Sequence, residues 1–376
     1  MIIGIDASRA FIETRTGTEN YSFHVITQMC QLLEAKKHTF VLFIRPNTKV
    51  PRELVGYSNV IVKEVNMKYL WTQLGLAWET WQKPTLDVLW VPAHTLPVLR
   101  RPNLKTVVTI HGIEYKWLKE YKNLLQRWYL PLSTIYAAKK ATGIIAVSNF
   151  TAHELQKETH IDKKRIKVIH EGFIIPAKKA LNTTPKVFDQ WDIEKHEYIL
   201  FVGSVQPRKN LVALIQAFKA YVGHFPDHKL VIAGQLAWDF EEIVASPARL
   251  KIEDKVIFTG WIGDTELRQL YLGALLYVQP SITEGFGLPV LEAMGCGVPV
   301  ISSDGGALRE VVGRGGIVVP LNSEFASELA KTMVKISKNE SLRKKLIALG
   351  EARVRALSWV KTAQKTLKHL VNIGSK

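Results

Sequence analysis

Short apolar segments alternate with longer amphipathic segments along almost the whole chain, and this alternation restricts the possible folds most strongly. Short apolar runs that alternate with helical patterns are typical of parallel strands covered by helices on both faces. The expected strands are Ile2–Asp6, Thr39–Ile44, Val60–Val65, Asp87–Val91, Thr106–Ile110, Gly143–Val147, Tyr198–Val202, Lys229–Ala233, Val256–Thr259, Leu275–Val278, Val298–Ser302 and Ile317–Val319. Twelve strands are more than one doubly wound domain needs, so the sequence predicts an α/β protein with two Rossmann-like domains.

A segment without clear periodicity, residues 172–197, separates the two sets of strands. It contains Pro176 and Pro185, which interrupt regular structure and indicate a linker. We therefore expect an N-terminal domain of residues 1–175 and a C-terminal domain of residues 176–358.

The longer segments between and after the strands follow a helical period. The expected helices include Asn20–Lys36, Asn210–His224, Thr265–Leu272, Ser323–Lys338 and Trp359–Val371. The last of these, which extends over residues 359–376, is expected to pack back on the N-terminal domain. Because open α/β sheets bind ligands at the carboxyl ends of their strands, we expect a binding site in a cleft between the two domains.

Basic side chains outnumber acidic ones by 50 to 34 in this chain of 376 residues, which gives a formal net charge of +16. Residues 1–180 carry 26 Lys and Arg against 14 Asp and Glu, a difference of +12. Residues 181–376 carry 24 against 20, a difference of +4. A positive charge concentrated in one half indicates an anionic partner: a phosphate-bearing ligand, nucleic acid or an acidic membrane face.

The two cysteines, Cys30 and Cys296, have no spacing typical of a metal site or a disulfide framework. Asp6 and Arg9 interrupt the apolar start of the chain where a signal peptide would need a continuous apolar stretch. No apolar run reaches the ~18 residues of a membrane span. We therefore expect a cytoplasmic protein without a transmembrane anchor.

The segment EGFGLPVLE, from Glu284 to Glu292, has the features of a ligand-binding strand end. Gly285 and Gly287 allow a backbone to approach a ligand closely, and the proline that follows favours the first turn of a helix, in which we expect Glu292. The free amides of a helix N-terminus attract phosphate or a polyhydroxyl ligand, and the two carboxylates can accept hydroxyl groups. The alternative is that Glu292 only complements the helix dipole and Glu284 is a solvated loop residue.

A second candidate segment, GSVQPRKNL, follows the strand expected at Tyr198–Val202. Gly203 and Ser204 are the first residues of the turn, and Arg208 and Lys209 lie further along it. An Arg fork and a Lys point charge together suit a diphosphate, whereas the alternative is an exposed basic turn. No G-x-G-x-x-G pattern follows a strand and no phosphate-binding G-x-x-x-x-G-K-[ST] loop is present, so neither a dinucleotide site nor a Walker-type NTPase is supported.

The N-terminal domain offers weaker signals. Gly17 begins a segment, GTENY, that we expect to form a loop between the first strand and its helix, where it could contact a phosphate or a sugar. His111 directly follows the strand at Thr106–Ile110, although a lone histidine is more often a core or surface residue. Ser148 follows the next strand and suits a helix cap. No Ser/His/Asp arrangement or paired-His metal site is distinctive.

Aromatic and basic residues are interleaved in the N-terminal domain. They are Tyr69, Trp71, Trp78, Trp81 and Trp90, then the segments Lys116–Lys122 and Arg127–Tyr129. This mixture suits a membrane interface, where rings lie at headgroup level and cations meet anionic lipids. It also suits single-stranded nucleic acid, and the remaining alternative is that most of the tryptophans belong to the core.

Several of these segments resemble the retaining glycosyltransferases of family 4, also called group 1. The resemblance rests on EGFGLPVLE with EAMGCGVPVISS, on GSVQPRKNL, TGWIGDTELRQLY, IAVSNFTAHEL and TIHG, which together extend over nearly the whole chain. It implies the GT-B fold, in which an acceptor-side N-terminal domain and a nucleotide-sugar-binding C-terminal domain face a cleft and the final helix returns to the first domain.

The resemblance also implies roles for individual residues. Arg208 and Lys209 match the basic pair at the donor diphosphate, and Glu284 and His111 match residues near the donor sugar. Glu292 matches the acid that holds the ribose hydroxyls of the nucleotide. The further donor-binding residues that it implies are Gly17, Gly203, Ser204, Phe286, Gly287 and Leu288. The chain departs from the family pattern at Gly17-Thr18, where many relatives have two glycines, and at His170-Glu171-Gly172, where relatives often have P-N-G.

The implied reaction moves a hexosyl group from a nucleoside diphosphate sugar to an acceptor hydroxyl with retention of configuration. GDP-mannose is the first donor expected and UDP-glucose the second, with a glycan or lipid-linked glycan acceptor in cell-surface polysaccharide or glycolipid assembly. We expect no metal and no other cofactor, no nucleic acid partner, and a peripheral position on the cytoplasmic face of an anionic membrane. The alternatives are a GT-B-like nucleotide-sugar epimerase and a basic nucleic-acid-binding protein.

Overall fold

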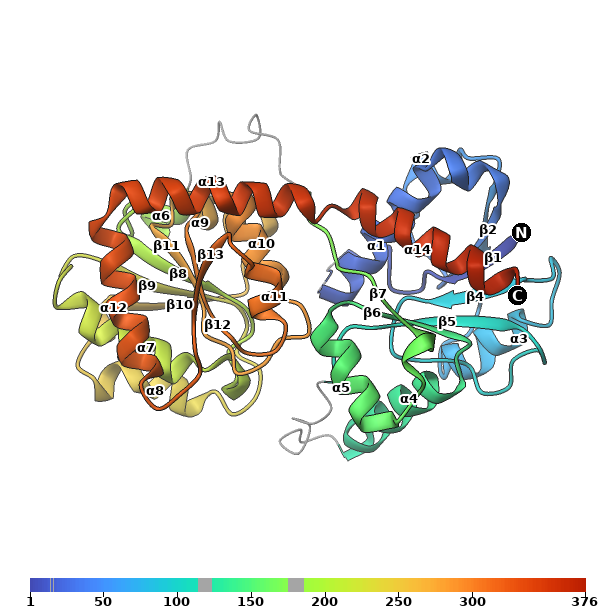
Figure 1. Cartoon of the computed structure of the whole chain (residues 1–376), viewed down its shortest axis with the longest axis horizontal. Coiled ribbons are helices and arrows are strands. Elements are labelled where there is room, and N and C mark those ends of the chain that lie inside the picture. The colour runs from blue at the N-terminus through green and yellow to red at the C-terminus, as the bar shows by residue number, and fades with distance from the viewer. Residues whose placement is uncertain (14, 16, 114–123, 175–185) are drawn as a thin grey trace. The chain divides into compact units, whose positions relative to one another are not determined.

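The computed structural model describes residues 1–13, 15, 17–113, 124–174 and 186–376, with the backbone alone for residues 124–128, 130 and 186. The chain forms two compact α/β units (Figure 1). Unit 1 consists of Met1–Gly172 and Leu357–Lys376, and unit 2 consists of Phe173–Ala356. These boundaries lie within three residues of those expected from the sequence.

Unit 1 contains a parallel sheet of seven strands in the order β3-β2-β1-β4-β5-β6-β7. The strands are β1 (Ile2–Asp6), β2 (Thr39–Ile44), β3 (Val60–Glu64), β4 (Val88–Val91), β5 (Lys105–Ile110), β6 (Gly143–Ala146) and β7 (Ile166–Val168). The strand order reverses between β1 and β4, which makes their carboxyl ends the switch point of this sheet. The first six strands were expected from the sequence; β7 was not, because Lys167 divides its apolar residues.

The helices of unit 1 lie between and after these strands. They are α1 (Gly17–Gln31), η1 (Leu33–Lys37), α2 (Arg52–Val55), η2 (Trp71–Leu76), α3 (Ala77–Glu79), α4 (Leu124–Lys140), α5 (Asn149–Thr159), η4 (Lys163–Arg165) and α14 (Trp359–Gly374). Ser148 caps α5, as expected, since its side chain accepts a hydrogen bond from the Thr151 amide. Helix α14 packs against α1, β4 and β5 (Figure 1).

The end of the chain is held tightly in unit 1. The Trp359 ring at the start of α14 stacks on His24 of α1, with ring centroids 5.2 Å apart. Thr362 Oγ1 donates to the His170 carbonyl oxygen at 2.8 Å. A Cβ on Gly172 would lie 2.2 Å from the Trp359 backbone nitrogen, so only glycine allows this approach of the two backbone segments. These contacts hold the segment that ends unit 1 at Gly172 beside the segment with which the chain returns to unit 1 at Leu357.

Unit 2 contains a parallel sheet of six strands in the order β10-β9-β8-β11-β12-β13. The strands are β8 (Tyr198–Val202), β9 (Lys229–Ala233), β10 (Val256–Gly260), β11 (Leu276–Gln279), β12 (Val300–Ser303) and β13 (Gly316–Val319), all of which the sequence predicted to within two residues. In this sheet the order reverses between β8 and β11, which are hydrogen-bonded neighbours. A ligand site is therefore expected at the carboxyl ends of these two strands.

The helices of unit 2 cover this sheet. They are α6 (Lys186–Gln190), η6 (Pro207–Lys209), α7 (Leu211–Val222), α8 (Glu241–Arg249), η7 (Glu253–Lys255), α9 (Asp264–Gly273), α10 (Leu288–Gly295), α11 (Leu308–Val312), α12 (Phe325–Lys338) and α13 (Glu340–Ala356). The core of unit 2 joins the apolar faces of α7 and α12 to the central strands. Tyr221 Oη of α7 shares a hydrogen bond of 2.9 Å with Ser337 Oγ of α12, which fixes these two helices against each other.

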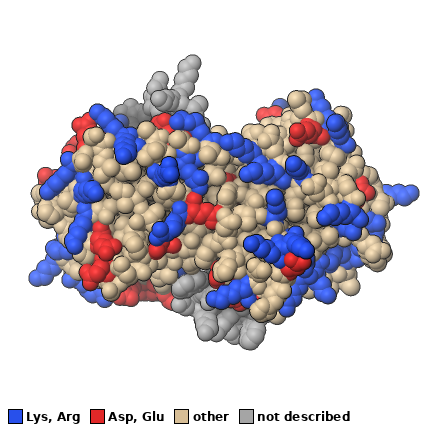
Figure 2. All heavy atoms as spheres, in the orientation of Figure 1, with Lys and Arg blue, Asp and Glu red and all other residues tan. Residues whose placement is uncertain are grey.

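Both units carry many exposed cations. Figure 2 shows Lys and Arg side chains distributed over the displayed face, with Asp and Glu side chains between them. Within the described part of the chain, no helix is long and apolar enough to cross a membrane.

Candidate functional site

The strongest candidate site lies at the switch point of unit 2. The 3₁₀ turn η6 follows β8 and carries Arg208 and Lys209, and the loop after β11 carries Glu284. The Ile282 amide donates to the Arg208 carbonyl oxygen at 2.9 Å, so the two strand-end loops are joined through their backbones. The sheet topology therefore brings Glu284 to the adjacent pair Arg208 and Lys209, from which it is about 75 positions away in the sequence.

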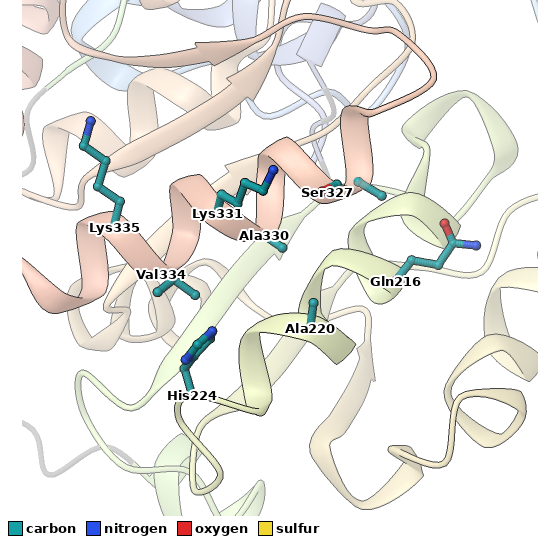
Figure 3. A pocket seen from close by; sticks show the side chains of 9 residues that line it. Gln216, Ala220, His224, Ser327, Ala330, Lys331, Val334 and Lys335 are labelled. Carbon is teal, nitrogen blue, oxygen red and sulfur yellow. The ribbon is translucent and has the colours of Figure 1, made fainter.

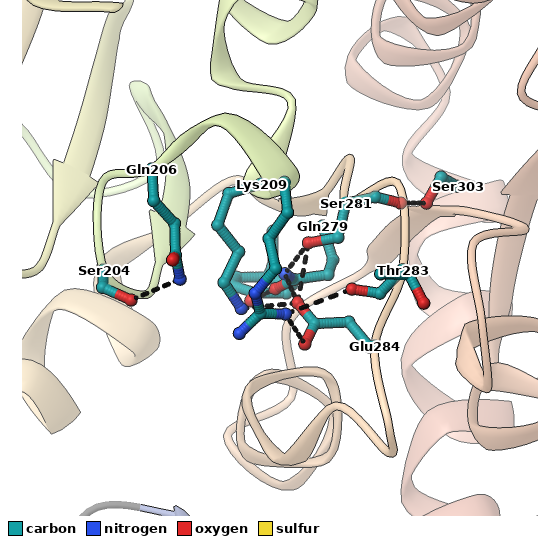
Figure 4. Close-up of polar contacts among 10 residues, drawn as sticks. Ser204, Gln206, Lys209, Gln279, Ser281, Thr283, Glu284 and Ser303 are labelled. Carbon is teal, nitrogen blue, oxygen red and sulfur yellow. Dashed lines mark hydrogen bonds and ion pairs between the residues drawn. The ribbon is translucent and has the colours of Figure 1, made fainter. Parts of the chain in front are cut away.

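Glu284 is the centre of this cluster (Figure 4). Lys209 Nζ donates to Glu284 Oε1 at 2.5 Å, and Arg208 Nη1 donates to Glu284 Oε2 at 3.0 Å. Gln279 Nε2 and Ser281 Oγ also donate to Oε1, at 3.0 Å and 2.7 Å. Both carboxylate oxygens are thus held in place, and the two cations exceed the single anion by one positive charge.

The charges of this cluster determine the protonation of Glu284. Only 7% of the Glu284 surface is exposed, and burial alone would raise the pKa of its carboxyl. The opposing effect of the Lys209 ammonium and the Arg208 guanidinium, together with the hydrogen bonds from Lys209 and Ser281, lowers the pKa of Glu284 to about 2. Glu284 is therefore a carboxylate at neutral pH.

Two supporting features of this cluster were not predicted from the sequence. One is the pair of neutral donors to Glu284, Gln279 and Ser281, which lie at the end of β11 and just after it. The other is the glycine pair after β12: a Cβ on Gly305 would lie 2.2 Å from the Ser281 carbonyl oxygen, and one on Gly306 would lie 2.3 Å from that of Glu284. The sequence could have indicated this second feature, because two adjacent glycines after an apolar strand are typical of a place where two backbone segments approach closely.

The helix α10 carries Glu292 and begins where the glycine segment ends. Gly287 precedes its first residue with a φ of 106°, a conformation that favours glycine, and Leu288 is the first helical residue. Glu292 is the fifth residue of the helix, so the expectation that it lies in the first turn is wrong by one position. Phe286 is buried, and its side chain anchors the segment.

Glu292 has a different environment from Glu284. Tyr271 Oη donates to Glu292 Oε2 at 2.9 Å. Burial raises the pKa of the Glu292 carboxyl, and the Asp264 charge adds to this effect, whereas the Tyr271 hydrogen bond opposes it. The segment thus places a firmly ionised carboxylate before α10 and a carboxyl with a raised pKa on the helix.

Gly203 and Ser204 lie directly after β8, as expected. Gly203 has a φ of 150°, and a Cβ at the neighbouring Gly234 would lie 2.1 Å from the Gly203 carbonyl oxygen. Ser204 Oγ accepts a hydrogen bond of 3.0 Å from Gln206 Nε2. The turn that leads to Arg208 is therefore compact and built on glycine.

His111 lies in unit 1, at the end of β5, and both of its ring nitrogens have partners. Nε2 lies 3.0 Å from the Pro92 carbonyl oxygen, which can only accept, and Nδ1 lies 2.9 Å from Glu171 Oε1. The hydrogen bond to the buried Glu171 carboxyl and the one to Pro92 together fix the orientation of the ring. Glu171 belongs to the His170-Glu171-Gly172 segment in which the chain departs from the family pattern, and its contact with His111 was not predicted.

Gly17 does not lie in a loop, as was expected, but is the first residue of α1. The helix begins three residues before the predicted start at Asn20, because the polar residues Thr18 and Glu19 are compatible with a first helical turn. A Cβ at Gly17 would meet no atom within 4 Å among the described neighbours.

The aromatic residues of unit 1 divide into two groups. Trp71 and Trp90 are buried, as the core alternative predicted, whereas Tyr69, Trp78 and Trp81 are exposed. Residues 116–122 lie outside the described residues, as do the side chains of Arg127 and Trp128.

A surface groove on unit 2 lies between α7 and α12 (Figure 3). Ala220, Ala330 and Val334 form its apolar part, and Lys331 and Lys335 lie along α12. Its lining contains none of the site residues expected from the sequence. Among the described residues, no group of three or more His, Cys, Asp or Glu is arranged to hold a metal ion.

Family comparisons define the class of protein that this site belongs to. The family described as Glycosyl transferases group 1 matches residues 183–353, and the family described as Glycosyltransferase Family 4 matches residues 23–174. The chain belongs to this glycosyltransferase family, as the sequence motifs had indicated, and it is a glycosyltransferase. It is 30% identical over 267 residues to the O-antigen chain mannosyltransferase B of Escherichia coli, which covers 70% of this chain and 69% of that protein.

Comparisons with solved structures confirm the predicted GT-B fold. Sucrose-phosphate synthase from Thermosynechococcus elongatus matches with a TM-score of 0.74 at 19% identity, covering all of this chain and 99% of that one. Anabaena Alr3699/HepE in complex with UDP-glucose matches with a TM-score of 0.68 at 19% identity, covering 99% of this chain and 99% of that one. At 19% identity these matches support the fold alone, so the reaction must be argued from the residues of the site.

Proposed function

We propose that this glycosyltransferase moves a mannosyl group from GDP-mannose to an acceptor hydroxyl, with retention of configuration, in the assembly of a cell-surface polysaccharide or glycolipid. The observation that carries the proposal is the cluster of Arg208, Lys209 and Glu284 at the switch point of unit 2. The choice of mannose is supported by the similarity to an O-antigen chain mannosyltransferase. UDP-glucose is the second donor to test.

The cluster suits a leaving diphosphate. Arg208 and Lys209 donate to Glu284, and the guanidinium and ammonium groups carry five and three N–H donors in all. The pair exceeds the charge of Glu284 by one, so the cluster attracts the negative charge that develops on the diphosphate as the glycosidic bond breaks. The backbone amides at the start of α10, beside Gly287 and Leu288, provide further donors for phosphate or sugar oxygens.

Glu284 is proposed to orient the two cations and the donor sugar rather than to attack the sugar. Its carboxylate accepts four side-chain hydrogen bonds, which lower the nucleophilicity of both oxygens. In a retaining reaction of this kind the leaving phosphate can take the proton of the acceptor hydroxyl, so no strong enzyme base is required. Glu292 is proposed to accept hydrogen bonds from the ribose hydroxyls.

The two basic side chains are proposed to replace a divalent metal, and turnover should then survive EDTA. This is tested by comparing initial rates of transfer with and without the chelator. Loss of all activity that Mg²⁺ or Mn²⁺ restores would overturn this part of the proposal.

Unit 1 is proposed to bind the acceptor, a glycan or lipid-linked glycan, with His111 near the donor sugar. Its positive charge supports a peripheral position on the cytoplasmic face of an anionic membrane, and we propose no nucleic acid partner. The Glu171 carboxyl holds the His111 ring in a fixed orientation through Nδ1.

A donor screen tests the proposal. Thermal unfolding is measured with GDP, UDP and their sugars, since a ligand at 100 times its dissociation constant adds about 2.7 kcal/mol to the free energy of unfolding. We expect GDP and GDP-mannose to give the largest increases. Labelled donor is then incubated with and without a lipid extract: transfer of label to lipid supports the proposal, whereas conversion of the donor without an acceptor would show an epimerase.

A further inference from the structure

Unit 1 exposes a group of large apolar side chains on two neighbouring segments. These residues, here called the aromatic patch, are Tyr69, Leu70, Leu74, Trp78, Trp81, Val98 and Leu99. Each of them is between 48% and 73% exposed. Single exposed apolar residues are normal on a protein surface, but contiguous ones mark an interaction surface.

Hydrogen bonds hold the two segments of the aromatic patch side by side. Gln73 Nε2 donates to the Leu96 carbonyl oxygen at 3.2 Å, and the Val98 amide donates to Gln73 Oε1 at 3.0 Å. Trp81 Nε1 donates to the Leu99 carbonyl oxygen at 3.3 Å, so the polar atom of this indole is satisfied while its ring remains exposed. The patch is therefore a defined surface of unit 1 and not a set of independent side chains.

The opposite face of the same segment is anchored in the core. Trp71 and Leu76 of η2 are buried and belong to the core cluster of unit 1, and Trp71 Nε1 donates to the Val65 carbonyl oxygen. Leu70 just before η2, Leu74 within η2 and Trp78 in α3 are all exposed. The core thus fixes one face of η2 and α3, and the other face is presented to solvent.

The charges around the aromatic patch are basic. Lys68 lies over the Tyr69 ring, with Nζ 5.3 Å from the ring centroid, and Lys83 is exposed. The acid within the segment, Glu79, is largely buried and forms an ion pair with Lys63. Two exposed acids flank this segment, Glu64 at the end of β3 and Asp87, whose Oδ2 accepts a hydrogen bond from the Ile2 amide. Between them, in residues 65–86, the exposed charges are those of Lys68 and Lys83.

We propose that the aromatic patch is a membrane-docking surface, which inserts its side chains into the interfacial layer of an anionic lipid bilayer. Indole and phenol rings settle at headgroup level, aliphatic side chains enter the acyl boundary, and lysines meet anionic headgroups. The net positive charge of residues 1–180 adds an electrostatic attraction to the anionic bilayer, which acts over a longer range than the contacts of the patch. The proposal rests on the proposed function in that it names the surface for the membrane position included there; the binding itself does not require glycosyl transfer.

Sedimentation with lipid vesicles tests the surface directly. The full-length protein is mixed with vesicles of phosphatidylcholine, with and without phosphatidylglycerol, at low and high salt. The test variant Trp78→Ser/Leu99→Ser changes one residue in each segment and removes no side-chain hydrogen bond that holds the segments together. Each of the two replacements should lower the partition coefficient on anionic vesicles by about tenfold. We therefore expect a decrease of about a hundredfold for the double variant. Salt should weaken the binding of the wild-type protein without abolishing it, because apolar insertion is not screened.

The matched control is Trp261→Ser, which removes an equally exposed indole (62%) from unit 2. It should sediment like the wild-type protein. Equal sedimentation of the wild-type protein and Trp78→Ser/Leu99→Ser would overturn the proposal, as would failure of the wild-type protein to bind anionic vesicles. A wild-type dimer that the double variant converts to a monomer would also overturn it, by showing that the patch binds a second copy.

Two further measurements separate this proposal from the proposed function. Thermal unfolding of each variant shows that it is folded, and its stabilisation by GDP reports the donor site independently. If the patch variant binds GDP normally and loses vesicle binding, the docking surface stands whatever the transfer assay shows. If the wild-type protein binds vesicles but neither binds nor transfers a nucleotide sugar, the proposed function fails and the docking surface remains.

Discussion

Replacement of Glu284 by Gln tests whether the site cluster is held together by charge. The substitution keeps the size of the side chain but removes its negative charge and converts one acceptor oxygen to an amide donor. Three donors converge on Oε1 and Arg208 Nη1 points at Oε2, so the Gln amide group must face at least one donor. Lys209, which is 8% exposed, loses its counter-charge.

The size of the effect follows from the pKa of Glu284, which the folded protein lowers from 4.5 to about 2. A lowered pKa in the folded state means that the carboxylate stabilises the fold above the unfolded pKa. This contribution is lost as the pH falls from about 4.5 towards 2. The shift corresponds to about 3 kcal/mol at neutral pH, and removal of one partner of a buried ion pair costs a similar amount.

Urea unfolding of wild-type protein and Glu284→Gln at pH 7, 5, 4 and 3 measures this contribution. We expect the variant to be less stable by about 3 kcal/mol at pH 7 and 5, with a smaller difference at pH 4 and 3. Glu340→Gln is the matched control, because Glu340 forms an exposed ion pair with Lys344 and its loss should leave stability unchanged. An equal difference at pH 7 and pH 3, or no difference at pH 7, would refute the reasoning.

The remaining predictions concern the second acid of the segment and the histidine pair. Glu292→Ala should weaken the binding of free nucleoside diphosphate by about tenfold or more in calorimetric titrations, whereas Glu284→Ala should mainly slow the sugar-dependent step. Equal losses of nucleotide affinity in both variants would remove this division of roles. Glu171→Ala should lower the free energy of unfolding by about 1–3 kcal/mol, because it leaves a ring nitrogen of His111 unpaired, and Glu171→Gln should restore most of it. A Gln variant no more stable than the Ala variant would contradict the hydrogen-bond explanation.

The fold could be predicted almost completely because buried parallel strands leave a clear mark in the sequence. The apolar run Tyr198–Val202 coincides with β8, and the apolar run of residues 230–233 makes up all of β9 except its first residue. The edge strand β7 was missed because its middle residue, Lys167, is exposed and breaks the apolar run. Edge strands and short turns depend on tertiary pairing, which no local pattern reports.

The candidate site could be predicted only as separate pieces. The basic turn with Arg208 and the acid Glu284 each follow a strand, but their contact depends on the strand order, in which β8 and β11 are neighbours although β9 and β10 come between them in the chain. The exposure of Trp78 and the burial of Trp71 likewise depend on which face of η2 and α3 meets the core. These facts arise from packing between distant segments and are not visible in residue spacing.

The most direct test of the proposed role of the cluster is the rate of sugar transfer after replacement of Arg208. Initial rates are measured at saturating donor for the wild-type protein, Arg208→Ala and Arg208→Lys, with thermal unfolding to show that each is folded. If the cluster stabilises the leaving diphosphate, Arg208→Ala should lower turnover by a factor on the order of 10² or more, and Arg208→Lys should recover part of the loss. Turnover of Arg208→Ala close to that of the wild-type protein would contradict the assignment of this cluster as the reaction site.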